Sequence, residues 1–526
     1  MRLQRFLGIT VCILCVGFFS LQAQETASGT VFLDQNNNGV LDAGEEGIPD
    51  VPVSNGRQVV TTDELGKYSI KINKNEGKVF VIKPAGYQVP TDEQNHPKFY
   101  YLHKPKGSPD LKYQGVEPTG KLPEAINFPL LKTTFGKRFK ALIFGDPQPE
   151  QKKELGYFDR DIVSELHNAT EYAFGITLGD MVDERLDWFS NYSKSVAKIG
   201  IPWFHVYGNN DMNMEAESDS AADETFEATF GPATYSFNKG NAHFIILDDI
   251  IYPRKDGGSG YRGGFTDKQI EFLKNDLKHV SRDKLIVVAF HIPIFGSFPE
   301  EDRKRLFNIL DKYPHTLSIS AHTHEQQFRF FDESQGWDRL KPHIHYNVGT
   351  TSGSWWTGVP DNRGIPPATM RDGTPNGYAT LNVDGNSFTI DYKAANKSAD
   401  YKMSMWGPEV VAKASGISAQ LYVNYFLGSK LTDVEYRYNG LDDWRYMRRV
   451  EQADPHLTTV MAKWDMAEKV LEGKRPINPS ESTHLWTMFL PTHLPLGKQT
   501  IQIRVTDMFG RTFTDEFTYE VVKPKQ

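Results

Sequence analysis

Five short apolar runs in the middle of the chain each end in polar side chains that can bind a metal ion. The runs alternate with segments of helical periodicity, which is typical of an α/β layer structure. Residues at the carboxyl ends of parallel strands project into one crevice of an open sheet, so we expect these polar side chains to converge. The five stretches are "ALIFGDPQ", "GITLGDMVDE", "FHVYGNND", "VVAFHIPIF" and "LSISAHTHEQQ".

These strand ends supply carboxylate, amide and imidazole groups but no thiolate. That mixture favours Mn, Fe or Zn over Cu(I) or an iron–sulfur cluster. Two such ions roughly 3.5–4 Å apart can bind phosphoryl oxygens and activate a water for in-line attack, and a carboxylate is the natural bridge between them. The candidate metal ligands are Asp146, Gln148, Asp180, Asn209, His291, His322 and His324.

The order and spacing of these motifs resemble the calcineurin-like metallophosphoesterase family, whose pattern runs D-x-H, G-D-x-x-D, G-N-H-D/E, H and G-H-x-H. The match spans Asp146 to His324. The resemblance implies a four-layer α/β/β/α sandwich with a dinuclear metal centre. It also implies hydrolysis of phosphate mono- or diesters by a metal-activated water.

The resemblance also implies a role for each ligand. Asp180 would bridge the two ions, and Asp183 would support the ligands without binding a metal itself. The other ligands would divide into Asp146 and His324 on the first ion, and Asn209, His291 and His322 on the second.

Three positions depart from the family pattern. Gln148 stands where His is usual, and its neutral oxygen can still bind a metal or orient a ligand through water. Ala321 replaces the Gly before His322, a small change that we expect only to adjust the turn. Asn210 stands where the family has the His that is taken to protonate the leaving oxygen. An amide cannot deliver that proton, although it can donate a hydrogen bond to a phosphoryl oxygen.

Position 210 decides how strong an enzyme to expect, since general acid catalysis contributes about 10²–10⁴-fold. The chain could act only on esters with good leaving groups, or another residue could supply the proton. Alternatively, it could be a catalytically impaired metal-containing protein that binds a glycan or envelope ligand. His205 lies in a strand-like run and is interpreted as structural, whereas His343 and His345 are closer candidates for a replacement acid.

Two stretches after the strand motifs are candidates for substrate contact. Trp355 and Trp356 lie in the Gly/Ser-rich stretch "GTTSGSWWTGVPDNRG". Large aromatic side chains in such loops tend to bind something, so we expect stacking on a small phosphoester or a phosphorylated glycan. A loop pinned by one buried Trp is the alternative. Arg254, Tyr261 and Arg262 are weaker candidates for phosphate contact.

Near the N-terminus, "DQNNNGVLDAGE" matches the calcium-loop pattern, with Gly39 at the sharp turn. Its flanks are strand-like, so the ion would brace a β domain rather than operate a helix–loop–helix sensor. The stretch resembles the calcium-loop β modules of bacterial surface proteins, and an Asn/Asp-rich turn without metal is the alternative. The candidate calcium ligands are Asp34, Asn36, Asn38, Asp42 and Glu45.

The first 23 residues are predicted to be a cleaved secretory signal peptide, because Arg2 and Arg5 precede an apolar run that ends in "SLQAQ". We therefore expect export to the periplasm, the cell surface or the medium, with no transmembrane anchor after cleavage. Both cysteines, Cys12 and Cys15, lie in this segment. The mature protein would then have no disulfide.

The rest of the chain predicts a β domain over 24–131, a metallophosphoesterase domain over 138–395 and a second β-sandwich over 396–526. Short alternating runs such as "KYSIKI" and "QTIQIRVTDMFGRTFTDEFTYEVV" indicate paired strands. The net charge of −8 lacks the basic footprint of a nucleic-acid binder, so no nucleic-acid partner is expected.

Overall fold

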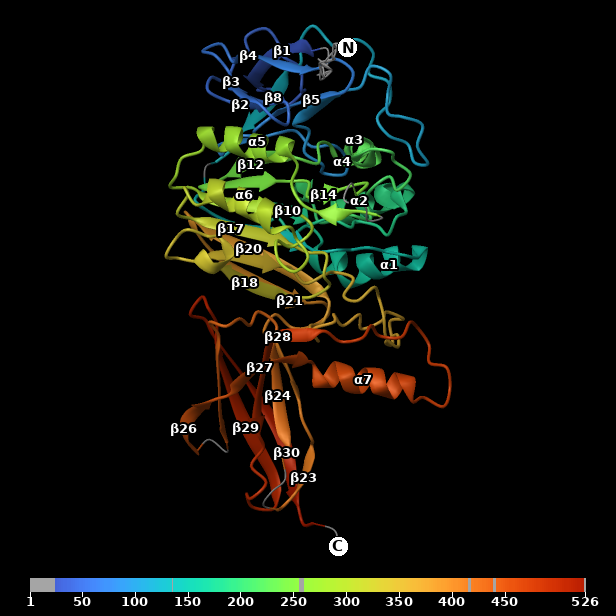
Figure 1. The fold of residues 1–526 in the computed structure, drawn as a ribbon, viewed down its shortest axis with the longest axis vertical. Coiled ribbons are helices and arrows are strands. Elements are labelled where there is room, and N and C mark those ends of the chain that lie inside the picture. The colour runs from blue at the N-terminus through green and yellow to red at the C-terminus, as the bar shows by residue number, and fades with distance from the viewer. Residues whose placement is uncertain (1–23, 135, 255–259, 415–417, 439–440, 525–526) are drawn as a thin grey trace, which may run out of the picture.

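The computed structural model describes residues 24–524, except 135, 255–259, 415–417 and 439–440. Three domains are stacked along the long axis, with a β domain at each end and an α/β domain between them (Figure 1). The predicted signal peptide lies outside the described residues. The predicted fold class is confirmed.

The N-terminal domain is a sandwich of two four-stranded sheets. In "KYSIKI" the side chains of Tyr68, Ile70 and Ile72 are buried and those between them are exposed, as period-two alternation requires. One sheet has the order β4 (Lys67–Asn73), β1 (Gln24–Leu33), β8 (Phe128–Lys132) and β6 (Tyr87–Gln88). The other has the order β3 (Val59–Thr61), β2 (Pro52–Ser54), β5 (Gly77–Val81) and β7 (Tyr100–His103).

The middle domain contains a five-stranded and a six-stranded sheet. The first has the order β11 (Trp203–His205), β10 (Phe174–Thr177), β9 (Arg138–Phe144), β20 (Gly377–Asp384) and β21 (Ser387–Ala394). The second has the order β12 (Tyr235–Lys239), β13 (Ala242–Ile246), β16 (Leu285–Ala289), β17 (Thr316–Ser320), β19 (His343–Asn347) and β18 (Gln327–Phe331). Strands β9, β10 and β11 are parallel in the first sheet, as are β13, β16, β17 and β19 in the second.

The helices of this domain are α1 (Lys152–Asp161), α2 (Phe189–Ala197), α3 (Asp219–Ala222), α4 (Glu224–Phe230), α5 (Asp267–Asp276) and α6 (Glu300–Leu310). Its 3₁₀ helices are η1 (Val163–Leu166), η2 (Leu186–Trp188), η3 (Leu277–His279) and η4 (Glu333–Gln335), and β14 (Ile250–Ile251) pairs with β15 (Arg262–Gly263). A capping box of Thr266 and Gln269 begins α5, which ends at Asp276.

Ring contacts show how the four layers are ordered. Phe174 of β10 packs on Phe244 of β13, with ring centroids 5.1 Å apart, so the two sheets face each other. On the outer face of the first sheet, Phe144 meets Phe158 of α1 at 5.9 Å. Phe307 of α6 packs on the second sheet, 5.3 Å from Phe331 of β18. The order is therefore helix, sheet, sheet, helix.

The C-terminal domain is a sandwich with one helix, α7 (Pro455–Asp465), on its side (Figure 1). A turn at Asp507 to Arg511 joins its last two strands. One sheet has the order β22 (Met403–Trp406), β24 (Gln420–Tyr425), β28 (Glu481–Phe489) and β27 (Arg448–Ala453). The other has the order β23 (Val410–Ala412), β30 (Thr512–Val522), β29 (Gly497–Thr506), β25 (Asp433–Tyr438) and β26 (Leu441–Tyr446).

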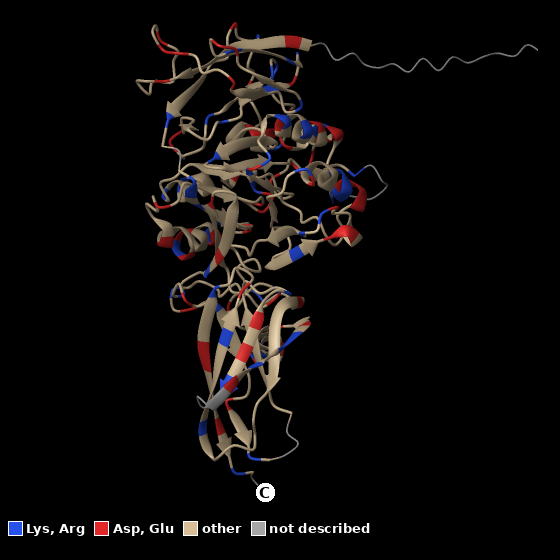
Figure 2. Ribbon diagram, turned by 90° about the vertical axis from the view of Figure 1, so that its left-hand side faces the viewer, with Lys and Arg blue, Asp and Glu red and all other residues tan. Residues whose placement is uncertain are grey.

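Polar contacts join both β domains to the middle domain. The backbone N–H of Trp203 donates to the carbonyl of Asn95 at 3.0 Å, and His484 lies 3.1 Å from Asp372. Charged residues of both signs are interspersed along the elements of all three domains (Figure 2). Within the described part of the chain, no helix combines the length and the apolar character needed to cross a membrane.

Candidate metal centre

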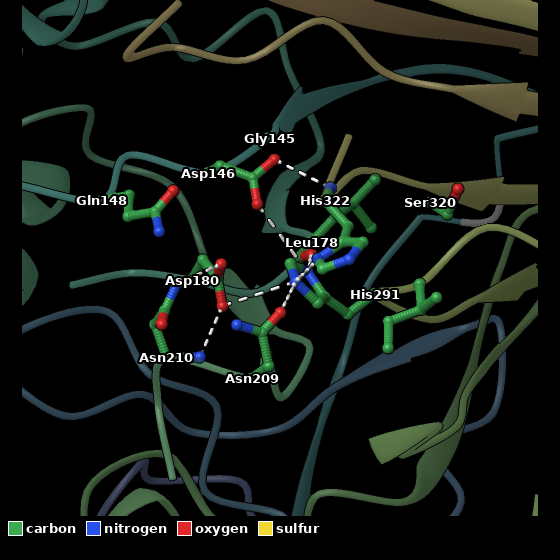
Figure 3. Close-up of polar contacts among 12 residues, drawn as sticks. Gly145, Asp146, Gln148, Leu178, Asp180, Asn209, Asn210, His291, Ser320 and His322 are labelled. Atoms are coloured by element: carbon green, nitrogen blue, oxygen red, sulfur yellow. Dashed lines mark hydrogen bonds and ion pairs between the residues drawn. The ribbon is translucent and has the colours of Figure 1, made fainter. Parts of the chain in front are cut away.

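The five strand ends meet, but they come from two sheets and not from one. Strands β9, β10 and β11 of the first sheet and β16 and β17 of the second each end shortly before one or two of the candidate ligands. The labelled candidate ligands lie together in Figure 3. Asp146 and Gln148 follow β9, Asp180 follows β10, Asn209 follows β11, His291 follows β16, and His322 and His324 follow β17. The centre therefore lies where the two sheets face each other.

Asp180, His291 and His322 form the tightest group, with one ligand atom from each lying within 4.8 Å of the others. His291 Nε2 lies 3.4 Å from Asp180 Oδ1 and 3.2 Å from His322 Nδ1. It also lies 3.0 Å from the side-chain oxygen of Asn209. The residues proposed for one ion and for the bridge are therefore together (Figure 3).

The residues proposed for the other ion lie beside this group. Asp146 Oδ2 accepts the backbone N–H of His322 at 3.0 Å, and Asp146 Oδ1 is 3.9 Å from His291 Nδ1. Gln148 Oε1 lies 2.9 Å from His324 Nε2. Gln148 Nε2 donates to Asp183 at 3.3 Å, so Asp183 contacts one of the candidate ligands.

The donor set fits divalent cations. Asp146 is fully buried, and its Oδ1 has no hydrogen-bond partner among the described residues. Burial raises the pKa of Asp146 to about 8 and lowers that of His324 to about 4. Burial, together with the nearby charge of His291, lowers the pKa of His322 to about 3. A cation would favour the deprotonated form of each of these groups, and oxygen and nitrogen donors without sulfur suit Mn, Fe or Zn.

Five of the seven candidate ligands have a positive φ angle, a backbone conformation that few non-glycine residues adopt. Such φ values cluster at functional sites, where the surrounding structure enforces them. The φ angles are 34° at Asp146, 35° at Gln148, 52° at Asp180, 71° at His322 and 54° at His324.

Two glycines let the ligand loops approach each other closely. A Cβ on Gly179 would lie 2.4 Å from His291 Nδ1, and one on Gly208 would lie 2.4 Å from Asp180 Oδ1. Gly179 and Gly208 are therefore required because a ligand from another loop occupies the space that a side chain would need.

Two buried aspartates that the sequence analysis passed over hold the ligand loops. Asp211 accepts the backbone N–H groups of Met181 at 2.9 Å and Gly208 at 3.1 Å, so it ties the loops after β10 and β11 together. Asp249 accepts the N–H of His291 at 3.1 Å. Asp211 closes the motif "GNND", and Asp249 lies three residues after the apolar strand β13, which ends at Ile246, much as the candidate ligands follow their strands.

Asn210 is bonded to the proposed bridging carboxylate. Its backbone N–H donates to Asp180 Oδ1 and its side-chain NH₂ donates to Asp180 Oδ2, both at 2.8 Å. The side chain is half-buried at the edge of the site. Asn210 thus supplies two hydrogen bonds at this position and no acid.

The structure offers no replacement acid among His205, His343 and His345. His205 is buried in β11, with its ring 4.0 Å from that of Phe230, as its structural interpretation requires. The suggestion that His343 or His345 lines the site is wrong, because both are buried on one face of β19 and bonded to Ser318. Burial lowers the pKa of His343 to about 3.

These two histidines belong to a polar ladder between β17 and β19. Ser320 lies 3.0 Å from His345 Nε2 and donates to Asn347 at 2.8 Å. Asn347 in turn donates to Thr323 and to the carbonyl of Glu325, both at 2.7 Å. The ladder ends on the loop that carries His322 and His324, so it positions that loop.

The adjacent tryptophans have different surroundings. Trp355 is half-buried and stacks on His324, with ring centroids 3.8 Å apart. Trp356 is 1% exposed and packs 5.7 Å from Tyr157, so its predicted contact with substrate is wrong in this structure. The alternative of a loop pinned by a buried Trp holds for this residue.

The three candidates for phosphate contact also lie in different surroundings. The ring of Tyr261 is half-buried and lies 6.3 Å from that of His322, next to the centre. Arg254 is exposed on the same loop. Arg262 is turned toward Asp302, 3.6 Å away, and donates to the carbonyl of Gly263 at 2.9 Å. Of the three, Tyr261 has the strongest support.

An arm of the C-terminal domain, residues 466–480, reaches back to this edge. The carbonyl of Lys474 accepts the N–H of Gly358 at 2.8 Å, close after the tryptophans. Its ammonium lies 2.6 Å from Glu150 and 2.8 Å from Glu154 of α1. The arm thus links the tryptophan loop to the segment that follows Gln148.

Comparisons with known proteins give the chain a family. Family models for the N terminal of calcineurin-like phosphoesterase, for calcineurin-like phosphoesterase and for the C terminal of calcineurin-like phosphoesterase match residues 35–114, 139–326 and 345–513. No curated protein matches the chain.

Solved structures similar to the chain include two proteins of low identity. One is a purple acid phosphatase from yellow lupin (Lupinus luteus) seeds, with 13% sequence identity and a TM-score of 0.38. The match covers 70% of this chain and 88% of that chain. The other is Vps29 of Chaetomium thermophilum, with 12% sequence identity and a TM-score of 0.24. The match covers 59% of this chain and 95% of that chain. The three family models follow one another along most of the sequence, and the strand-end motifs lie in the second of them. The chain belongs to the calcineurin-like phosphoesterase family.

Proposed function

We propose that this chain is an exported, metal-dependent hydrolase of phosphate mono- or diesters that holds two divalent transition ions. The proposal rests on one observation above all, the contacts that bring seven candidate oxygen and nitrogen ligands together after strands of two facing sheets. Export rests on the predicted signal peptide alone. The substrate would be a small phosphoester or a phosphorylated glycan.

In this proposal the candidate ligands divide between the two ions. Bound there, such ions supply Lewis-acid polarisation of a phosphoryl oxygen and a water acidic enough to attack near neutral pH. Asp180 would lie between the two ions, in contact with both. Asp146, Gln148 and His324 would hold one ion, and Asn209, His291 and His322 would hold the other.

The chain's own residues would then bind and orient the ester. Asn210 has its NH₂ at the edge of the site and can donate to a phosphoryl oxygen in place of Asp180. Tyr261 lies beside His322, and its hydroxyl is a second donor. Burial, together with the charges of Asp180 and Asp146, raises the pKa of Tyr261 to about 12, so it keeps its proton at neutral pH.

Departure of the leaving group sets the limit on this activity. Asn210 cannot protonate the leaving oxygen, and the histidines proposed as replacements are buried elsewhere. We therefore expect activity on esters whose leaving groups depart without a proton, such as nitrophenyl esters. Alkyl esters would react slowly.

Asn210 also favours a second function, a metal-containing protein that binds a glycan or envelope ligand and turns it over poorly. In that case Trp355, half-buried beside His324, would contribute to the binding surface. The two functions make opposite predictions for the native chain with its metals bound.

The test is hydrolysis of nitrophenyl phosphate and bis(nitrophenyl) phosphate with added Mn or Zn. Native protein, Asn210→His and Asp180→Asn would be compared at equal protein concentration, with the metal content of each measured. Hydrolysis by the native chain that is lost in Asp180→Asn supports the enzyme. A native chain that is inert with two ions bound, beside an active Asn210→His, supports the binding protein.

A further inference from the structure

A second set of oxygen ligands lies in the N-terminal domain, in the loop of residues 34–45 that follows β1. Oxygen-bearing side chains stand at positions 1, 3, 5, 9 and 12 of this twelve-residue loop, and Gly39 stands at position 6. Calcium loops draw their ligands from these positions and need a glycine at the sixth for the sharp turn. The five side chains are Asp34, Asn36, Asn38, Asp42 and Glu45.

Hydrogen bonds draw these positions together. Asp34 Oδ2 accepts the N–H of Gly39 at 2.9 Å, across the loop. The carboxylate of Glu45 accepts the N–H of Gln35 at 2.9 Å and that of Asp42 at 3.0 Å. Gly39 has a φ of 74°, which a residue with a Cβ rarely adopts.

Asp34 is the residue whose surroundings point to a bound cation. It is 4% exposed, and its bond to Gly39 directs the carboxylate into the loop. Its other oxygen, Oδ1, is buried and has no hydrogen-bond partner among the described residues. A buried carboxylate oxygen without a partner is rare in folded proteins because its desolvation is not offset. A cation within the loop would offset it.

The two asparagines leave oxygen atoms for such a cation. Their NH₂ groups both donate to Asp42 Oδ2 at 2.8 Å, and these bonds, led by that of Asn36, lower the pKa of Asp42. The amide oxygen of Asn36 accepts the N–H of Asn38, and that of Asn38 accepts the N–H of Val40. Each amide oxygen has a second lone pair that can bind a metal ion.

We infer that residues 34–45 bind one Ca²⁺ ion. The loop offers oxygens only, with three carboxylates and no imidazole or thiolate, so a hard cation fits and the transition ions of the metal centre do not. Mg²⁺ is also hard, but it usually keeps several waters and takes one or two carboxylates.

The position of the loop indicates what the ion does. Asp34 follows β1, which pairs in parallel with β8 from Val31 opposite Phe128 to Leu33 opposite Leu130. The N–H of Asp34 donates to the carbonyl of Leu130 at 3.1 Å. Strand β8 is the last of its domain before β9, which leads to Asp146. Bound Ca²⁺ would brace the domain where the chain passes into the metallophosphoesterase domain.

The test uses the full chain with Asp180→Asn as background. This substitution weakens the metal centre, so Ca²⁺ bound there interferes less with the measurement of Ca²⁺ bound to the loop. After chelation, CaCl₂ alone is titrated by calorimetry and by thermal unfolding, with MgCl₂ in a parallel titration. We expect one Ca²⁺ per chain and a rise in melting temperature. Glu45→Gln should weaken Ca²⁺ binding at least tenfold and remove the rise, whereas Glu46→Gln, an exposed neighbour with the same charge change, should retain both.

Equal Ca²⁺ affinity in the background protein and Glu45→Gln would overturn the inference, as would the absence of Ca²⁺ binding or a preference for Mg²⁺. Asp34→Asn is a second variant, and Glu45→Gln decides if that variant does not fold. Phosphoesterase activity is measured on Glu45→Gln in the native background, where it should be unchanged. Failure of the calcium site is thereby distinguished from failure of the proposed function.

Discussion

Asn210 caps both carboxylate oxygens of Asp180, one through its backbone N–H and the other through its side-chain NH₂, each at 2.8 Å. The residue that replaces the family's acid is therefore in contact with the proposed bridge. A histidine at position 210 would lie beside the same carboxylate, the proposed bridge between two ions.

Asn210→His should reduce the dependence of rate on the leaving group. Asn210 cannot protonate the leaving oxygen, so the kcat/KM of the native chain should fall steeply along a series of aryl phosphates as the pKa of the released phenol rises. The variant should fall less steeply and gain about 10²-fold on the poorest leaving groups. Parallel slopes for the two proteins would contradict this.

Asp180→Asn should lower metal occupancy from about two ions per chain to less than one, because one carboxylate contacts both proposed sites. Elemental analysis of purified protein checks the number. Asp187→Asn is the matched control, since this exposed aspartate pairs with Arg185 at the surface. Unchanged occupancy in Asp180→Asn would remove it as the bridge.

Asn347→Ala should weaken metal binding by about 10-fold to 100-fold, because Asn347 bonds Thr323 and Glu325 on the loop between and beyond two ligands. The measurement is competition for Zn²⁺ against a chelator. Asn382→Ala removes an asparagine of β20 that bonds Asp391 instead, and its metal affinity should match the parent. Equal losses in the two variants would point to a general loss of stability.

The contribution of His205 to the free energy of unfolding should fall as the pH drops below about 6.5. Burial lowers the pKa of His205 well below its usual value, and His96 adds to this. The unfolded chain therefore binds a proton at His205 that the folded chain excludes, so folding loses on the order of 2 kcal/mol between pH 7.5 and 5 from this residue.

His205→Phe should remove part of this acid sensitivity, because the site is aromatic, with Tyr192 and Phe230 against the ring. Denaturant unfolding at pH 7.5 and 5 measures the difference. His456→Phe, at an exposed position of α7, serves as the control. If both variants lose the same free energy on acidification as the parent, His205 is not a source of the sensitivity.

Local sequence patterns determined much of this protein. Apolar runs that end in "GD", "GNND" or "HTH" specified the strands and the ligands, and alternation specified the β domains. The capping box that begins α5 and the turn at Asp507 are local in the same way, since each depends on neighbours within a few positions.

Only the tertiary structure decided how these pieces meet. The sequence indicated one crevice, but two sheets supply the ligands, and Asp249 enters from β13 to hold His291. The burial of Trp356 and the polar ladder around His345 depend on partners far along the chain. Such contacts are set by how sheets and loops pack, and no periodicity within a strand encodes which distant residue will fill the adjoining space.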